Sequence, residues 1–143
     1  MNQKITTSQP VSTALVIRLL KALDKAGADD CGEWLLVHPN DLDQLLTDTI
    51  TDLAWAFRST FLSGVTGIEQ DVFEAIQANE RFESNNPAML SIIRGTCGIE
   101  TFVRQAIQAD GAGHFLAGYD NEEFECPVKI GKNWILWTAY RTN

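Results

Sequence analysis

The hydrophobic period of this chain changes at Gly113, and this change constrains the fold more than any other feature. Before Gly113, apolar residues recur at spacings of three and four, which is the pattern of amphipathic helices. After it, apolar and polar residues alternate, and residues 134–142 are rich in the aromatic and β-branched residues that strands favour. We therefore predict an α+β protein in which a helical region precedes a small sheet.

The clearest helical pattern covers residues 41–63, and Asn40 is a suitable N-cap for that helix. A first helix is predicted between Ser12, as its N-cap, and Gly27, as its stop. Apolar spacing predicts further helical segments within residues 68–83, 85–96 and 98–113.

The C-terminal region predicts a β-hairpin. Residues 124–128 alternate, residues 130–133 (IGKN) form a turn signal, and the aromatic-rich run follows. Residues 114–118 (HFLAG) are expected to add a third strand. Residues 33–37 (EWLLV) fit either a short strand or a buried extended segment, because so short a run has no decisive period.

These elements predict a single domain over residues 1–143. Residues 1–9 are expected to be flexible, residues 10–110 mainly helical, and residues 113–143 a β-hairpin. A lone hairpin is marginally stable in water, so it must pack on the helices. The expected architecture is a bundle of about four to five helices covered by a two- to three-stranded antiparallel sheet.

Composition excludes several classes of function. The 143 residues carry 19 acids and 11 bases, a net charge of -8, which disfavours direct binding of nucleic acid or of an anionic membrane. The three cysteines are far apart and form no CxxC pair, so we expect neither a metal site nor a disulfide framework, but reduced thiols in the cytoplasm. No glycine-rich phosphate loop with its lysine is present, and no cofactor is predicted.

The acids are concentrated in two stretches that contain no lysine or arginine. Residues 26–57 hold seven acids and residues 105–128 hold five. This segregation favours docking to a basic surface of a partner protein, and the alternative is a solvated face that keeps the protein soluble. The predicted binding residues are one face of the long helix and one loop: Asp41, Asp48, Asp52, Asp120, Glu122 and Glu123.

The rival hypothesis is a small enzyme. His114 could act as acid or base near neutral pH, as imidazole side chains do, beside Tyr119 and Asp120 in a pocket where helices meet the sheet. Cys97 is the better thiol nucleophile of the chain, because a helix is predicted to start just after it and lower its pKa. His38 or His114 would be the base for this thiol.

The aromatic residues of the last strand suggest a second copy as a partner. Trp134 and Trp137 are three residues apart, so on a strand they point to opposite faces. One face can cover the helices, and a homodimer is expected to cover the other, unless the first helix or residues 33–37 bury it.

The end of the chain, with GHFLAGYD, NEEFE and YRTN, resembles the ends of short uncharacterised proteins encoded in bacterial and phage genomes. The resemblance covers roughly 30 of the 143 residues. It implies a bacterial or mobile-element source and identifies no catalytic residues. The sequence thus predicts a non-enzymatic acidic accessory or regulatory factor that binds a basic protein surface.

Overall fold

The computed structural model describes residues 3–78 and 83–143 and confirms the α+β class. The chain divides into two compact units. The first, here called the sheet unit, consists of Met1–Leu46 and Ala112–Asn143, and the second, the helical unit, is Thr47–Gly111. The first boundary falls inside helix α2 (Pro39–Asp52). The two units are described separately below.

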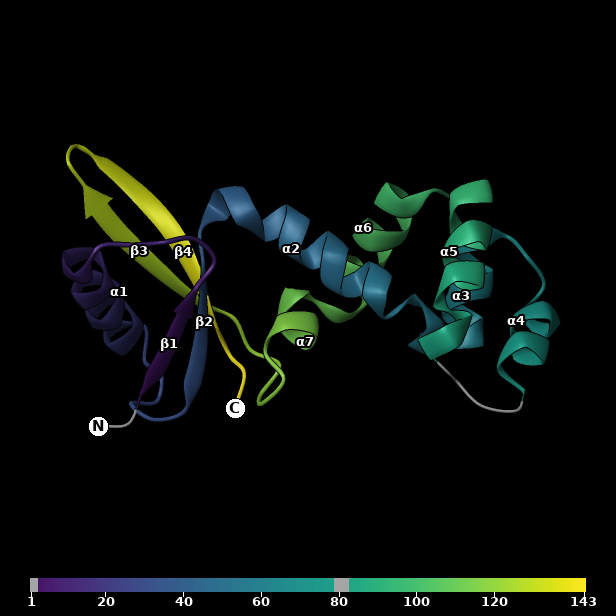
Figure 1. Cartoon of the computed structure of the whole chain (residues 1–143), viewed down its shortest axis with the longest axis horizontal. Coiled ribbons are helices and arrows are strands. Elements are labelled where there is room, and N and C mark those ends of the chain that lie inside the picture. The colour runs from purple at the N-terminus through teal and green to yellow at the C-terminus, as the bar shows by residue number, and fades with distance from the viewer. Residues whose placement is uncertain (1–2, 79–82) are drawn as a thin grey trace. The chain divides into compact units, whose positions relative to one another are not determined.

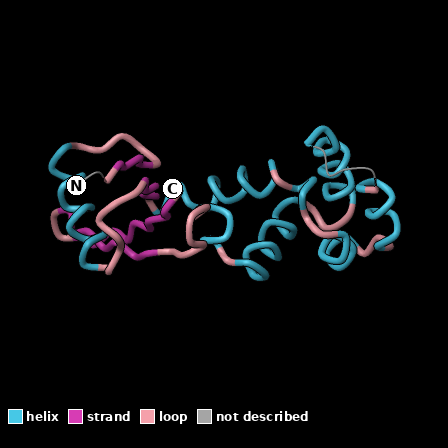
Figure 2. Tube along the Cα trace, turned by 90° about the horizontal axis from the view of Figure 1, so that it is seen from below, coloured by secondary structure: helices cyan, strands magenta, loops and turns pink. Residues whose placement is uncertain are grey.

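All the strands of the described residues lie in the sheet unit, which also holds both termini (Figures 1 and 2). They form one four-stranded mixed sheet of order β1-β2-β4-β3. Strands β1 and β2 are parallel, whereas β2–β4 and β3–β4 are antiparallel. The strands are β1 (Lys4–Thr7), β2 (Glu33–Val37), β3 (Phe124–Ile130) and β4 (Asn133–Arg141).

The sheet differs from the expected one at its N-terminal strand. Residues 4–7 are a strand rather than part of a flexible segment, because the β1 backbone pairs with β2 from Lys4–Glu33 to Thr7–Leu36. The side chain of Ile5 adds to this by packing against the core. The predicted all-antiparallel sheet of two or three strands was therefore wrong in strand number and in direction.

Helix α1 (Thr13–Lys25) packs on the sheet along β3. Its ends are those expected: the Ser12 hydroxyl accepts a hydrogen bond from the Leu15 amide at 3.2 Å, and Gly27 follows the helix with φ +87°. The shared core contains eight buried residues from α1, β2, β3 and β4: Leu19, Leu23, Trp34, Leu36, Cys126, Val128, Trp137 and Ala139.

The C-terminal hairpin is confirmed, but the segment before it is not a strand. Residues Ala112–Leu116 form the short helix α7, which lies against β4. The segment HFLAG therefore does not extend the sheet. Trp137 is buried on one face of β4, and on the opposite face Tyr140 is buried while Trp134 is 66% exposed. The alternation of faces predicted for β4 is thus present.

The helical unit is built from short helices and has its own core. It contains the end of α2, two 3₁₀ turns, and four α-helices. Its elements are η1 (Ala54–Ala56), α3 (Ser59–Thr66), α4 (Gln70–Gln77), η2 (Glu83–Asn85), α5 (Asn86–Gly95) and α6 (Ile99–Asp110). The end of the helix predicted over residues 68–83 lies partly at residues 79–82, outside the described residues.

The predicted helix over residues 41–63 is broken. Helix α2 begins at Pro39, which makes Asn40 helical rather than an N-cap, and it ends at Asp52. The Asn86 side chain accepts from the Trp55 amide and donates to the Thr51 carbonyl, each at 2.9 Å. The Gln77 amide donates to the carbonyls of Trp55 and Phe57. These side chains form hydrogen bonds with backbone groups that would pair with each other if the helix were continuous.

The helical unit has its own core, and a cluster of three aromatic rings packs at one part of it. Phe57 and Phe61 stack with ring centroids 5.1 Å apart, and Phe102 contacts both rings edge-on. Residues Thr47–Gly111 bury apolar side chains among themselves. The described residues contain seven α-helices instead of four to five.

Candidate functional site

A groove with a cationic rim lies between α1 and the edge strand β3 of the sheet unit. It has a volume of about 1050 Å³. Figure 1 shows α1 running beside the β3–β4 hairpin. Four of the residues that line the groove are bases, one is an acid, and the rest of the lining is largely apolar. The lining residues are Arg18, Lys21, Ala22, Lys25, Ala26, Glu125, Pro127, Val128, Lys129, Gly131 and Trp134.

The helix period produces this rim. Leu19 and Leu23 are fully buried against the sheet, whereas Arg18, Lys21 and Lys25 are exposed at spacings of three and four on α1. Residues at such spacings lie on the same face of a helix. The three cations of α1 are therefore presented along one line beside the sheet.

Strand β3 supplies the opposite wall. Val128 is buried and Lys129 is exposed, as the alternation of a strand requires. The Arg18 guanidinium donates a hydrogen bond from Nη1 to the Lys129 carbonyl oxygen at 3.2 Å, which ties α1 to the edge of the sheet. Lys129 pairs in register with Trp134 on β4. The exposed indole of Trp134 and the lysine thus stand side by side on one face of the hairpin.

The predicted acidic loop, Asp120 to Glu123, makes hydrogen bonds within itself and to the elements beside it. Asp120 Oδ1 accepts from the Glu122 amide at 3.0 Å, and the Asn121 amide donates to the Ala117 carbonyl at 2.9 Å. Asn121 has a positive φ of 59°, which asparagine tolerates better than most residues. The Glu123 carboxylate accepts a hydrogen bond from the Tyr140 hydroxyl at 2.5 Å.

Burial and this hydrogen bond to Glu123 raise the pKa of Tyr140, so its hydroxyl remains a donor at neutral pH. Glu123 therefore has a structural partner inside the sheet unit. Glu122 is exposed, and its carboxylate has no partner among the described residues. Of the predicted loop residues, Glu122 is the one whose charge is fully presented outward.

The predicted helix face of Asp41, Asp48 and Asp52 is present on α2, with different environments. The Asp41 carboxylate accepts hydrogen bonds from the Ser8 hydroxyl at 2.8 Å and from the Gln9 amide at 3.0 Å. It therefore anchors the segment after β1 to the start of α2. Asp48 and Asp52 are exposed.

The residues of the enzyme hypothesis lie in separate contacts. His114 is exposed on α7, and its ring meets Phe115 edge-on at 5.0 Å. Tyr119 is 60% exposed and stacks under the Arg141 guanidinium, 3.8 Å from the ring centroid. Within residues 3–78 and 83–143, no hydrogen bond joins His114 to Tyr119 or Asp120.

The three cysteines lie in different surroundings. Cys97 is half-buried just before α6, as expected, and its sulfur contacts the carbonyl oxygen of Gly98 at 3.5 Å. His38, one of its predicted bases, instead accepts at Nδ1 from the Asn40 amide at 3.0 Å and packs on the Trp137 ring. Burial raises the pKa of the Cys126 thiol to about 11, which keeps it protonated at neutral pH.

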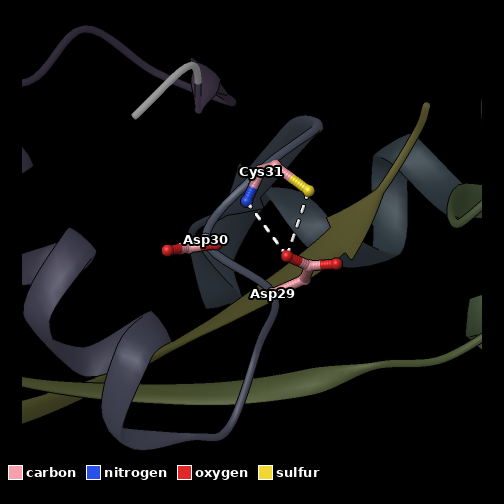
Figure 3. Close-up of side chains that lie close together, drawn as sticks. All are labelled: Asp29, Asp30 and Cys31. Carbon is pink, nitrogen blue, oxygen red and sulfur yellow. Dashed lines mark hydrogen bonds between the residues drawn. The ribbon is translucent and has the colours of Figure 1, made fainter.

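One further cluster of metal-ligand types is Asp29, Asp30 and Cys31, whose ligand atoms lie within 4.8 Å of one another (Figure 3). Asp29 Oδ1 accepts from the Cys31 amide and thiol, and Arg141 lies 3.2 Å from Oδ2. The hydrogen bond to Asp29 raises the pKa of the Cys31 thiol, whereas a metal requires the thiolate. The carboxylate is already paired, so this donor set does not fit a metal ion.

A second groove, in the helical unit, offers no charge. It has a volume of about 540 Å³ and is lined by uncharged residues of α3 and α6: Phe61, Gly64, Val65, Thr101, Gln105, Gln108 and Ala109. It therefore gives no indication of the chemistry of a ligand.

Comparisons with family models, curated proteins and solved structures found no match to this chain. The resemblance of the C-terminal segment to bacterial and phage proteins stays a prediction. None of the helices in the described ranges has both the length and the apolar character needed to cross a bilayer. The expected homodimer also stays a prediction, and Trp134 and Leu136, exposed on β4, are the residues that it would cover.

The cationic groove was not predicted from the sequence. Lys21 and Lys25 lie near the C-terminal end of α1, where the helix dipole favours positive charge, and with Arg18 they form one exposed line on that helix. That spacing was a usable signal. The contribution of Lys129 could not be predicted from the sequence, because it depends on the packing of α1 against β3, more than 100 residues away in sequence.

Proposed function

We propose that this chain is a non-catalytic accessory or regulatory protein that binds the basic surface of a partner protein by electrostatic docking. The observation that carries the proposal is the fixed acidic loop between α7 and β3. A loop that is already ordered binds without the entropy cost of ordering itself. Its exposed carboxylate, Glu122, is presented from a backbone that hydrogen bonds hold on both sides.

Glycine at position 113 is part of that order. A Cβ atom built on Gly113 would lie 2.8 Å from the carbonyl carbon of Asn121, closer than carbon atoms can approach. The loop is thus packed directly on the backbone of α7. Tyr140, through Glu123, fixes its other end to β4.

The distribution of charge supports the same proposal. Four of the 11 bases and one of the 19 acids line one groove, so the rest of the chain has seven bases and 18 acids, a balance of -11. Such a field raises the rate at which a basic partner associates, and the rate falls as salt screens it.

The alternative hypothesis is a small enzyme that uses His114 as its acid or base. General acid–base chemistry needs a base within hydrogen-bond reach of its partners, usually in a recess. His114 is exposed on the surface of α7, and its ring contact is with Phe115. No observation therefore favours catalysis over binding.

The proposal includes the cellular compartment and the source of the protein. The three cysteines are free, which suits a reducing cytoplasm. The C-terminal resemblance suggests a bacterial or mobile-element source. In that setting, an acidic surface would occupy a basic groove of a partner that otherwise binds nucleic acid.

The test is a pull-down from the source cell with wild-type protein and two charge-reversal variants. Glu122→Lys changes the exposed charge of the loop, whereas Asp24→Lys makes the same change of charge on α1, outside the predicted binding residues. We expect capture at about 0.05 M salt that is lost at about 0.5 M salt, because screening lengths shorten from more than ~10 Å to less than ~5 Å. Capture is expected to be lost with Glu122→Lys and kept with Asp24→Lys. Capture that persists with Glu122→Lys, or at high salt, contradicts the proposal.

A further inference from the structure

We propose that the groove between α1 and β3 binds an acidic segment of a partner protein, as a peptide, independently of the acidic loop. The groove is the place in the sheet unit where the sign of the charge is reversed. Residues 1–46 and 112–143 contain seven bases and ten acids, a net charge of -3, yet the groove lining holds four bases and one acid, a net charge of +3. Cations that cluster on a surface whose average charge is negative indicate an anionic ligand.

The dimensions of the groove suit a short extended chain. Arg18 and Lys25 are seven residues apart on α1, a distance along the helix of about 10 Å at ~1.5 Å per residue. An extended peptide covers that distance with about three residues at ~3.3 Å each. Side chains on one side of such a peptide repeat at about 6–7 Å, so two carboxylates can reach the line of cations on α1.

The edge of β3 favours recognition through side chains over addition of a strand. Strand β3 is at one edge of the sheet. Pro127 has no amide hydrogen to offer a new strand, and the carbonyl oxygen of Lys129 already accepts from Arg18. Both features protect an edge against strand pairing. A ligand in this groove therefore uses its charges and its apolar side chains.

An apolar contact completes the site. Trp134 is 66% exposed, and it lies next to Pro127 and Lys129 in the groove lining. An exposed tryptophan supplies a large contact area at low cost in conformational entropy, and such residues are often the energetic centre of an interface. We therefore expect the peptide to combine acidic residues with an aromatic or aliphatic residue that covers Trp134.

A peptide fits better than a nucleic acid. A nucleic acid carries a phosphate at every nucleotide and would continue past both ends of the groove, over a surface whose average charge is negative. A peptide carries charge only at selected positions. A second copy of this chain would bring its own net charge of -8 to the contact, and it is treated as an outcome of the test.

The experiment uses the full-length chain and a random library of 12-residue peptides, with enriched peptides then measured singly by fluorescence anisotropy. Lys21→Glu is the groove variant and Lys4→Glu is its matched control, because Lys4 is an exposed base of the same unit on the opposite edge strand, β1. Trp134→Ala tests the apolar contact. Binding of a dT12 oligonucleotide tests a nucleic acid as the occupant, and sedimentation velocity of the free protein tests a second copy of the chain.

We expect enriched peptides to be acidic with an aromatic or aliphatic residue, to lose about tenfold or more in affinity with Lys21→Glu and with Trp134→Ala, and to be unaffected by Lys4→Glu. Enrichment of neutral or basic peptides, or no enrichment, overturns the proposal. So does tighter binding of dT12 than of any peptide, or a dimer that Lys21→Glu dissociates.

This inference and the proposed function can fail separately. Glu122→Lys is expected to leave peptide affinity unchanged, and Lys21→Glu is expected to leave capture of the basic partner unchanged. A loss of both activities in one variant, with circular dichroism unchanged, would mean that a single surface performs both.

Discussion

The substitution Gly113→Ala tests whether the acidic loop is fixed by its contact with α7. Two effects oppose each other. Alanine in place of a helical glycine gains at most ~1 kcal/mol, and less here because Gly113 is near the start of a five-residue helix. The new Cβ would lie 2.8 Å from the Asn121 carbonyl carbon and 3.1 Å from that of Glu122, so backbone must move.

Forcing an extra methyl group into a packed site costs about 1–3 kcal/mol, and the neighbours of Gly113 are backbone atoms that yield less than a flexible side chain. The clash therefore exceeds the gain, and we expect a net loss of about 1–2 kcal/mol. For a chain of this size, this corresponds to a fall in Tm of about 3–6 °C.

Gly64→Ala is the control, because Gly64 lies inside α3 and a Cβ there meets no atom within 4 Å. It is expected to stabilise the protein by about 0.5–1 kcal/mol. Thermal unfolding of both variants, followed by circular dichroism, measures the two shifts. The reasoning is refuted if Gly113→Ala is as stable as the wild type or more stable, since the loop would then have room to move.

Three other predictions concern single side chains. Asn86→Ala is expected to lower the free energy of unfolding in urea by about 1–3 kcal/mol, because it leaves the Trp55 amide and a second backbone group without partners; an unchanged midpoint would contradict this account of the break after α2. Iodoacetamide at about pH 8 is expected to leave Cys126 unmodified in the native protein and to modify it after unfolding, as mass spectrometry of its peptide would show. Folding raises the pKa of this thiol from 9.0 to about 11, so the unfolded state loses its proton first as the pH rises. The contribution of this thiol to stability is therefore expected to be complete below the lower of these two pH values and to be lost between them. Tyr140→Phe removes the hydrogen bond to Glu123 and is expected to cost about 1–3 kcal/mol in the same urea assay; no loss would mean that the loop does not depend on this contact.

The parts of the fold that were predicted correctly are those with a local cause. The boundaries of α1 follow from Ser12 and Gly27, and both act within the helix or next to it. The β3–β4 hairpin follows from alternation on both sides of a turn. These local signals predict the structure correctly because no distant residue competes with them.

The errors have distant causes. The break after Asp52 depends on Asn86 and Gln77, which are 20 to 35 residues away from the backbone groups they bind. Strand β1 depends on a parallel partner across α1, and its short polar sequence has no pattern of its own to show it. Periodicity reports which side of an element is apolar. It does not report which side chain elsewhere will take a backbone hydrogen bond.

The candidate sites show the same difference between local and distant causes. The excess of acids could be read from the sequence, because charge is a sum over residues. The line of cations on α1 could also be read from its spacing, but the groove itself could not, because its second wall depends on where α1 meets β3. The acidic loop and the cationic groove attract ligands of opposite charge. A basic surface would avoid the groove and an acidic peptide would avoid the loop, so the two sites select against each other's ligands. Together, the two proposals predict a protein that binds two partners of opposite charge, and Glu122→Lys and Lys21→Glu separate the two contacts.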